Sequence, residues 1–92
     1  MKVEKLGEGR PEIAVVTGIH GDEPEGWNAV QKFKEADYDV KKPVKFVYAN
    51  EEAAEKNVRF IDTDLNRSFP GDPESESHEE RLAAKLVEEL QG

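Results

Sequence analysis

The chain has 92 residues, no cysteine and a formal net charge of −8. That length supports a single domain over residues 1–92, and the missing cysteine excludes disulfides, thiol nucleophiles and cysteine-bound zinc. The acidic charge argues against nucleic acid and anionic membranes as main partners, because both require clustered lysine and arginine. No apolar stretch resembles a signal peptide or could span a bilayer, so we expect a cytoplasmic protein.

The first half of the chain predicts two strands and a helix. Residues 1–6 alternate weakly between apolar and polar side chains, and we expect an edge strand there. Residues 12–17 form a β-branched run, which is typical of a buried strand in a parallel or mixed sheet. A helix is predicted to follow, capped by Asp22 with Glu25 as its capping-box partner, and to end near residue 36 or 37.

The second half continues this alternation of strands and helices. We expect a strand over residues 44–49, a helical turn within 50–57, a short strand over 58–61 and a loop over 69–73. The last helix is predicted to be capped by Ser77 with Glu80 as its box partner. It presents an apolar stripe made of Leu82, Leu86, Val87 and Leu90. This order predicts an α/β sheet with right-handed crossovers.

The last helix also suggests that the domain continues. Its stripe should cover a sheet, so the expected next element is another strand and the chain is expected to be the front part of a larger domain. We expect marginal stability, with the exposed stripe covered by self-association or by a missing C-terminal part. Trp27 and Phe33 are expected core anchors of the first helix. Phe46 and Tyr48 are expected on one face of the 44–49 strand, and Phe60 is expected to pack in the 58–61 strand.

A histidine and a glutamate lie three residues apart where the 12–17 strand turns into the helix. His20 and Glu23 are flanked by Gly18 and Gly21, which leave the backbone free to take positive φ and let a ligand approach. Sites in open α/β sheets form beyond the carboxyl ends of strands, and imidazole and carboxylate are good zinc ligands. The same residues also fit a simple helix start with His20 exposed, and the spacing alone leaves both interpretations open.

A second group of polar residues lies within residues 58–71, before the last helix. Arg59, Asn66 and Arg67 concentrate donors in an otherwise acidic chain, and an arginine with a neighbouring amide is suited to gripping a carboxylate. Asp64, if buried, could orient an arginine or a histidine. Taken alone, the segment fits surface ion pairs and an Asx turn somewhat better.

Together, the two groups resemble the succinylglutamate desuccinylase/aspartoacylase family, which are zinc hydrolases related to the M14 carboxypeptidases. The resemblance is carried by residues 18–24, 49–50, 58–59 and 64–71. A His-Gly-Asp-Glu turn followed at this separation by an Asp-Leu-Asn-Arg turn is specific, whereas either turn alone is not. The resemblance implies the N-terminal part of a zinc-carboxypeptidase-like three-layer α/β/α domain with a mixed or mostly parallel sheet.

The resemblance also implies roles for individual residues. His20 and Glu23 match the first two ligands of a Zn²⁺ ion, and Arg59 matches an arginine that polarises the scissile carbonyl. In this family a zinc-activated water cleaves the amide or ester bond of an N-acyl amino acid, with a glutamate as the base.

The remaining implied roles concern the substrate. Asn66 and Arg67 match the pair that binds the carboxylate of a small anionic N-acyl amino acid, and Asp64 matches a supporting acid of the same turn.

The resemblance covers only part of the family's active site. The family's third zinc ligand and catalytic glutamate follow the helix that ends at Gly92, so the 92 residues are expected to be inactive alone. We expect His78 to be solvent-exposed rather than a ligand. The acidic cluster beside it is expected to be a solvated helix start; it consists of Glu74, Glu76, Glu79 and Glu80.

Other functions remain open. One is a non-catalytic metal- or carboxylate-binding module that keeps His20, Glu23, Arg59 and Arg67 without chemistry. Another is a structural relict in which the motifs persist without a formed site. Within the enzyme class, the alternative is a carboxypeptidase-like zinc peptidase, since that relative also pairs a His-x-x-Glu motif with an Asn-Arg motif.

Overall fold

The computed structural model describes residues 1–36 and 42–91, which form one mixed sheet with helices packed on it. The elements in chain order are β1 (Lys2–Leu6), β2 (Ile13–Thr17), α1 (Glu25–Glu35), β3 (Val44–Tyr48), α2 (Glu51–Glu55), the 3₁₀ helix η1 (Leu65–Arg67) and α3 (His78–Gln91). The strand order is β1-β3-β2, with β1 antiparallel and β2 parallel to β3. The predicted α/β class and mixed sheet are therefore confirmed.

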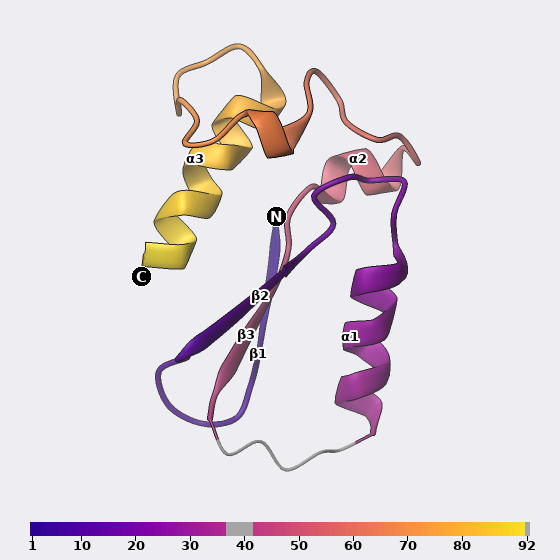
Figure 1. The fold of residues 1–92 in the computed structure, drawn as a ribbon, viewed down its shortest axis with the longest axis vertical. Helices are drawn as coiled ribbons and strands as arrows, with labels where there is room; N and C mark the ends of the chain where they lie inside the picture. The colour runs from indigo at the N-terminus through magenta and orange to yellow at the C-terminus, as the bar shows by residue number, and fades with distance from the viewer. Residues whose placement is uncertain (37–41, 92) are drawn as a thin grey trace.

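The helices cover opposite faces of the sheet, which gives the predicted three layers (Figure 1). On one face, Phe46 of β3 packs with Trp27 and Val30 of α1. On the other face, Val47 packs with Leu86 of α3. The alternation of side chains along a strand explains how one central strand feeds both cores.

β2 is more exposed than the prediction of a buried strand over residues 12–17. These residues were expected to form a buried strand, but Ile13, Ala14 and Val15 are exposed. The reason is that β2 pairs with β3 on one side and with no other strand among the described residues. The buried strand is β3, which lies between β1 and β2. The predicted edge position of β1 is confirmed.

The predicted strand over residues 58–61 does not form. This segment is irregular, and the backbone N–H of Ile61 donates to the side chain of Glu79 instead of to a neighbouring strand. Phe60, expected in the core, is consequently 38% exposed. Phe33 is exposed to the same degree, although its ring lies 6.3 Å from that of Phe46. Trp27 is buried as predicted, and Phe46 and Tyr48 lie on one face of β3 as predicted, packed in the same cluster.

Neither predicted capping box forms. The N-cap of α1 is Pro24 without a side-chain hydrogen bond, because a turn closed by Glu23 N–H on the carbonyl of His20 separates Asp22 from the helix. The C-cap is Ala36, whereas residue 37 lies outside the described residues.

At the start of α3, long-range contacts replace the local box. The hydroxyl of Ser77 is buried without a hydrogen-bond partner in the described structure. Instead, the N–H of His78 donates to the carboxylate of Asp62 at 2.7 Å, and Glu80 accepts from Ser75.

The apolar stripe of α3 is mostly covered, contrary to expectation. Leu82 and Leu86 are buried against β3 and η1, Val87 is half-buried, and Leu90 is 44% exposed. No helix among the described residues is long and apolar enough to cross a membrane.

We predict that Leu86→Ala lowers the free energy of unfolding by about 2–5 kcal/mol, because it leaves a cavity between α3 and the sheet. Leu90→Ala, the matched control on the same helix, should change it by less than about 0.5 kcal/mol. Urea unfolding followed by circular dichroism measures both. Equal losses in the two variants would mean that the inner part of the stripe is not packed on the sheet.

Candidate functional site

The β2–α1 turn begins at a glycine that the backbone requires. Gly18 has φ +69°, and a side chain there would also collide with the ring of Tyr48. Just before and at this turn, the carbonyls of Thr17 and Gly18 accept hydrogen bonds from Ala49 and Asn50, which continue the parallel pairing past β3. The turn is thus held at the carboxyl ends of two parallel strands, where sites in such sheets form.

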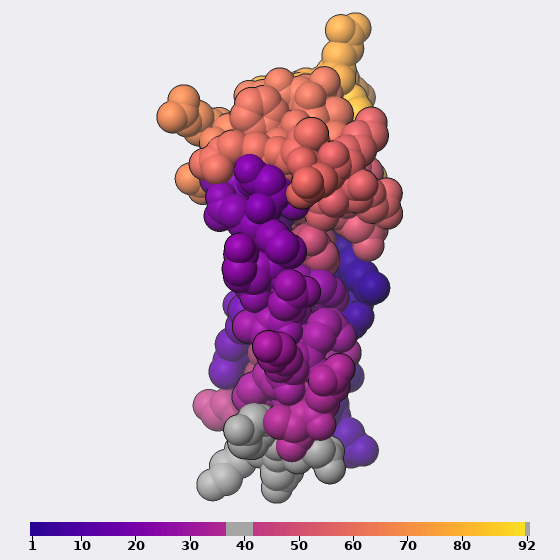
Figure 2. Space-filling model, turned by 90° about the vertical axis from the view of Figure 1, so that its right-hand side faces the viewer, coloured from indigo at the N-terminus to yellow at the C-terminus, as the bar shows by residue number. Residues whose placement is uncertain are grey.

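A second glycine brings the turn against a distant segment. Gly21 is buried, and a Cβ at this position would collide with the backbone of Ala53 and Val58. Its N–H donates to the carbonyl of Arg59 at 3.0 Å. The contact of the β2–α1 turn with the later segment is visible in the space-filling view (Figure 2). The close approach expected at Gly21 is therefore made by the protein's own backbone rather than by a ligand.

His20 lies between two carboxylates. Its Nε2 is 3.0 Å from Oδ1 of Asp64, and its Nδ1 is 3.3 Å from Oε2 of Glu23. The hydrogen bond with His20 is the main cause that holds the pKa of Asp64 below its ordinary value. Both carboxylates can only accept, and the shorter distance to Asp64 favours Nε2 as the nitrogen that carries the hydrogen of a neutral ring, which leaves the lone pair of Nδ1 on the side of Glu23.

Arg59 reaches the same glutamate from the other side. Its Nη1 donates to Oε2 of Glu23 at 3.0 Å, and both side chains are about half exposed. Arg59 therefore neutralises Glu23 in the absence of any other cation. The contact also joins the segment after α2 to the turn before α1, which lie 36 residues apart in the chain.

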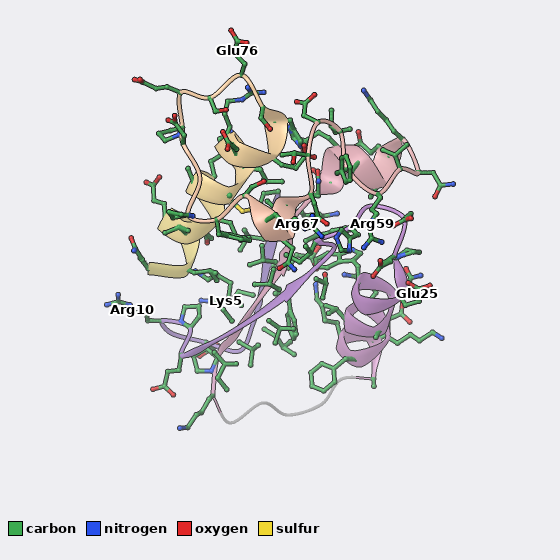
Figure 3. All side chains as sticks on the ribbon, turned by 45° about the horizontal axis from the view of Figure 1, so that its top comes forward. Lys5, Arg10, Glu25, Arg59, Arg67 and Glu76 are labelled. Carbon is green, nitrogen blue, oxygen red and sulfur yellow. The ribbon has the colours of Figure 1, made fainter. Side chains whose placement is uncertain are left out.

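The turn at η1 carries the other predicted site residues. Oδ1 of Asp64 accepts the N–H of Asn66, which is an Asx turn, and the hydroxyl of Ser68 donates to the carbonyl of Asp64. Leu65 is fully buried and fixes the turn to the core. Asn66 and Arg67 are exposed. Arg59 and Arg67 both lie near the end of β2, whereas Lys5 and Arg10 lie elsewhere (Figure 3).

The geometry of His20 and Glu23 fits two ligands of one metal ion. Tetrahedral ligand atoms bonded at about 2.0–2.1 Å lie about 3.3 Å apart, and the Nδ1–Oε2 distance is 3.3 Å. A carboxylate oxygen beside the lone pair of Nδ1 favours a cation between or next to the two atoms, either a proton on Nδ1 or a metal ion. Among residues 1–36 and 42–91, no group of three histidine, aspartate or glutamate side chains converges to hold a metal.

Glu79 supports the site and was not identified from the sequence. It is fully buried, whereas it was expected in a solvated cluster. Oε1 accepts from the N–H groups of Asp62 and Thr63 at 2.7 and 2.9 Å. Oε2 accepts from the N–H of Ile61 at 2.8 Å and from Nδ2 of Asn50 at 2.9 Å.

The hydrogen bonds to Glu79 keep its carboxylate ionised. Burial, the largest influence, raises the pKa of Glu79, but the hydrogen bonds from Ile61, Thr63, Asn50 and Asp62 together outweigh it and hold the pKa below its ordinary value. A signal for this burial was present, since Glu79 lies at the i position of the i, i+3, i+4, i+7 face that includes Leu82, Ala83 and Leu86.

A family model described as the succinylglutamate desuccinylase/aspartoacylase catalytic domain matches residues 10–92. The chain belongs to this family. A probable aspartoacylase from Prochlorococcus marinus subsp. pastoris is 36% identical in an alignment of length 80 that covers 85% of this chain and 27% of the relative. One from Acaryochloris marina is 34% identical in an alignment of length 86 that covers 86% of this chain and 29% of the relative. The chain therefore spans less than a third of these relatives.

Solved structures of the family share the fold. The succinylglutamate desuccinylase from Vibrio cholerae superposes with a TM-score of 0.76 at 30% identity, over 86% of this chain and 24% of that protein. The corresponding protein from Vibrio parahaemolyticus superposes with a TM-score of 0.77 at 22% identity, over 97% of this chain and 34% of that protein. These superpositions support the predicted three-layer α/β arrangement.

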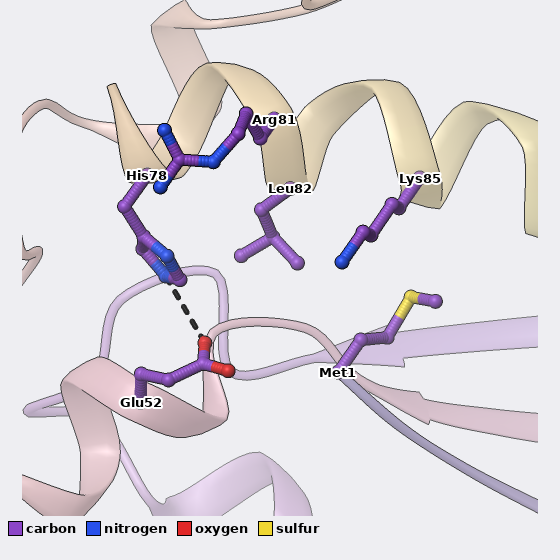
Figure 4. Close-up of a pocket in the computed structure, with 6 residues that line it drawn as sticks. All are labelled: Met1, Glu52, His78, Arg81, Leu82 and Lys85. Atoms are coloured by element: carbon purple, nitrogen blue, oxygen red, sulfur yellow. Dashed lines mark ion pairs between the residues drawn. The ribbon is translucent and has the colours of Figure 1, made fainter. Parts of the chain in front are cut away.

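One hollow on the surface of this chain borders the candidate site, and another lies away from it. One of about 320 Å³ follows the end of β2 and is lined in part by His20 and Glu23. Another of about 350 Å³ lies on the other side of α2, between α3 and the start of β1 (Figure 4). There His78, expected to be exposed, is mostly buried, with Nε2 3.1 Å from the carboxylate of Glu52 and 3.0 Å from Oδ1 of Asn50.

The lowered pKa of Glu79 predicts a pH-dependent stability. Glu79→Gln should lower the free energy of unfolding near neutral pH by roughly 2–4 kcal/mol, because hydrogen bonds to a buried charge are lost. A depressed pKa contributes stability that is present above the ordinary value of 4.5 and is lost as the pH falls through the folded pKa. The difference between variant and unmodified chain should therefore shrink toward acid, as measured by urea unfolding from about pH 7 to about pH 3.

Glu76→Gln is the matched control for this prediction, because Glu76 is exposed and points away from the molecule (Figure 3). It should unfold like the unmodified chain at each pH. A deficit of Glu79→Gln that stays constant across the pH range would show that the carboxylate charge is not the stabilising group.

Proposed function

We propose that the chain is the N-terminal portion of a zinc-dependent hydrolase domain that cleaves the amide or ester bond of a small anionic N-acyl amino acid. The relatives that support this activity are named probable aspartoacylases and succinylglutamate desuccinylases. The observation that carries the proposal is the facing pair of His20 Nδ1 and Glu23 Oε2 at the end of β2, with Arg59 and Asp64 in contact with it. In this proposal, the third zinc ligand and the catalytic glutamate lie outside these 92 residues.

His20 and Glu23 would hold the Zn²⁺ ion through Nδ1 and Oε2. When bound, zinc lowers the pKa of its water to about 7 and polarises a carbonyl. Asp64 keeps the hydrogen of His20 on Nε2, so that Nδ1 remains an unprotonated donor, which is the usual arrangement of a carboxylate, a histidine and a metal. The hydrogen bond from Arg59 to Glu23 must then weaken. The guanidinium of Arg59 would thereby become available to donate to the scissile carbonyl.

Asn66 and Arg67 would bind the substrate's carboxylate. Both side chains are exposed on η1, and Arg67 lies near Arg59 at the end of β2 (Figure 3). A guanidinium offers a bidentate fork to a carboxylate, and the adjacent amide adds a donor. Two arginines at this edge of an acidic chain favour an anionic substrate, which supports an N-acyl amino acid over a neutral amide.

A second candidate function is a carboxylate-binding module without chemistry. The observation that favours it is the direct contact of Arg59 with Glu23, which occupies one of the proposed ligands in the absence of zinc. The two candidates differ in metal affinity, because a binding module that uses only the arginines needs no cation at His20.

Zinc titration by calorimetry tests the proposal. The 92-residue chain should bind one Zn²⁺ weakly, because it supplies two ligands, and His20→Ala and Glu23→Ala should each abolish the binding. Glu25→Ala, which removes an exposed carboxylate at the start of α1, is the control and should bind like the unmodified chain. Binding that is unchanged in the His20 and Glu23 variants would contradict the proposed metal site.

The substrate class is tested in the parent protein. N-acyl amino acids should be hydrolysed in preference to peptides with free C-termini, and Arg67→Lys should raise KM by about tenfold with a smaller effect on kcat, because the bidentate fork is lost. Preference for peptides would favour the carboxypeptidase-like alternative. An unchanged KM in Arg67→Lys would remove Arg67 from the carboxylate site.

A further inference from the structure

Residues 61–63 wrap around the carboxylate of Glu79 as a backbone anion site wraps around a bound anion. Three consecutive N–H groups, from Ile61, Asp62 and Thr63, all point at one side chain that belongs to another element. Successive backbone N–H groups that converge in this way form an anion-binding concavity. In this chain the anion is supplied by α3, so the conformation of the loop depends on the presence of this charge.

The anchored triplet lies between the residues of the candidate site. Two residues before it, Arg59 donates to Glu23, and its carbonyl accepts the N–H of Gly21. Directly after it, Asp64 contacts Nε2 of His20. A displacement of the triplet would therefore move both the group that orients His20 and the group that contacts Glu23.

The carboxylate is itself held in one orientation. Nδ2 of Asn50 donates to Glu79, while Oδ1 of Asn50 accepts from Ala53 N–H and contacts Nε2 of His78. These contacts fix which end of the Asn50 amide faces Glu79. The carboxylate therefore presents Oε1 to two amides of the loop and shares Oε2 between the third amide and Asn50.

We propose that Glu79 is a positioning residue of the site: its carboxylate holds residues 61–63 so that Asp64 orients His20 and Arg59 reaches Glu23. Its catalytic meaning rests on the proposed function, but the positioning itself is a property of the metal-free chain. Glu79→Gln keeps the size of the side chain and replaces one acceptor oxygen by an NH₂ group. Whichever way the amide turns, that group meets at least one N–H of the loop, and a donor facing a donor cannot bond.

The experiment uses the ¹⁵N-labelled, metal-free 92-residue chain at a single pH above the ordinary pKa of imidazole. The ring ¹⁵N shifts of His20 report which nitrogen carries the hydrogen, and the backbone amides of residues 64–67 report the position of the loop. In Glu79→Gln, the two ring shifts should move toward each other, because Asp64 no longer selects one tautomer, and the amides of residues 64–67 should shift. Zinc affinity should fall by about tenfold, the lower end of the effect of losing a supporting carboxylate.

Two controls separate positioning from general stability. Glu76→Gln removes a charge just before α3, three residues from Glu79, and should leave the His20 signals unchanged. Leu86→Ala leaves a cavity between α3 and the sheet and should lower the melting temperature, but it removes no hydrogen-bond partner of Glu79, so the His20 signals should stay near those of the unmodified chain. If Leu86→Ala changed the His20 signals as much as Glu79→Gln does, the effect would be one of stability, and the proposal would be overturned.

The proposal is also overturned if a folded Glu79→Gln chain shows unchanged His20 ring shifts. If Glu79→Gln does not fold, Glu79→Asp replaces it, since it keeps the charge but withdraws the carboxylate by one methylene, and the same changes are expected at smaller size. Unchanged His20 shifts in Glu79→Asp would then overturn the proposal. Failure of the unmodified chain to bind zinc would count against the proposed function, whereas the ring shifts would still decide the role of Glu79.

Discussion

A single buried carboxylate determines how this chain brings the two turns of its candidate site together in space. Glu79 is fully buried at the start of α3 and accepts three backbone hydrogen bonds from the loop before η1. An unpaired charge at such a depth would be strongly unfavourable, so the loop and the helix must form together. The backbone N–H groups of residues 61–63 are hydrogen-bonded although these residues belong to neither a helix nor a sheet. The segment that carries Arg59, Asp64 and Arg67 is thereby joined to α3.

The other half of the candidate site depends on the sheet. β2 and β3 are parallel, so their carboxyl ends lie at the same edge, and the turn with His20 and Glu23 leaves from that edge. Gly21 lets the turn meet the backbone near α2 without a side chain between them. The site therefore forms where a strand end, a helix start and an anchored loop meet. The end of β2 and the start of α1 flank the pair of His20 and Glu23 in the chain, whereas the loop residues Arg59 and Asp64 reach it from 36 and 44 residues away.

Much of this arrangement followed from local patterns. Glycine and proline positions predicted most element boundaries, and the β-branched run at residues 12–17 predicted β2. The location of His20 and Glu23 at a strand end followed from the rule for parallel sheets. The approach of Arg59 and Asp64 to this turn did not follow from any local pattern and came only from the family resemblance. Long-range hydrogen bonds between irregular segments leave little periodic trace in a sequence.

Two of the incorrect predictions, the strand over residues 58–61 and the cap at Ser77, share a physical cause. The segment at residues 58–61 was expected to form a strand, but the amide of Ile61 faces a buried carboxylate and that of Val58 donates to the carbonyl of Ala53. Ser77 was expected to cap α3, but Asp62, 16 residues away in the chain, accepts the first N–H of the helix. In each case a tertiary hydrogen bond replaced a local one. Glu79 itself was assigned to solvent because charged residues near a helix start are usually solvated, even though its spacing placed it on the apolar face of α3.

The measurement that tests the anchoring role of Glu79 most directly is hydrogen exchange of the individual amides in the unmodified chain. If Glu79 anchors the loop, the amides of Ile61, Asp62 and Thr63 should be protected to the same extent as those of β3, despite lying in irregular structure. The exposed turn at residues 7–9 supplies the reference rate for amides in an exposed turn. Exchange of Ile61, Asp62 and Thr63 at that rate would contradict the central role of the buried carboxylate.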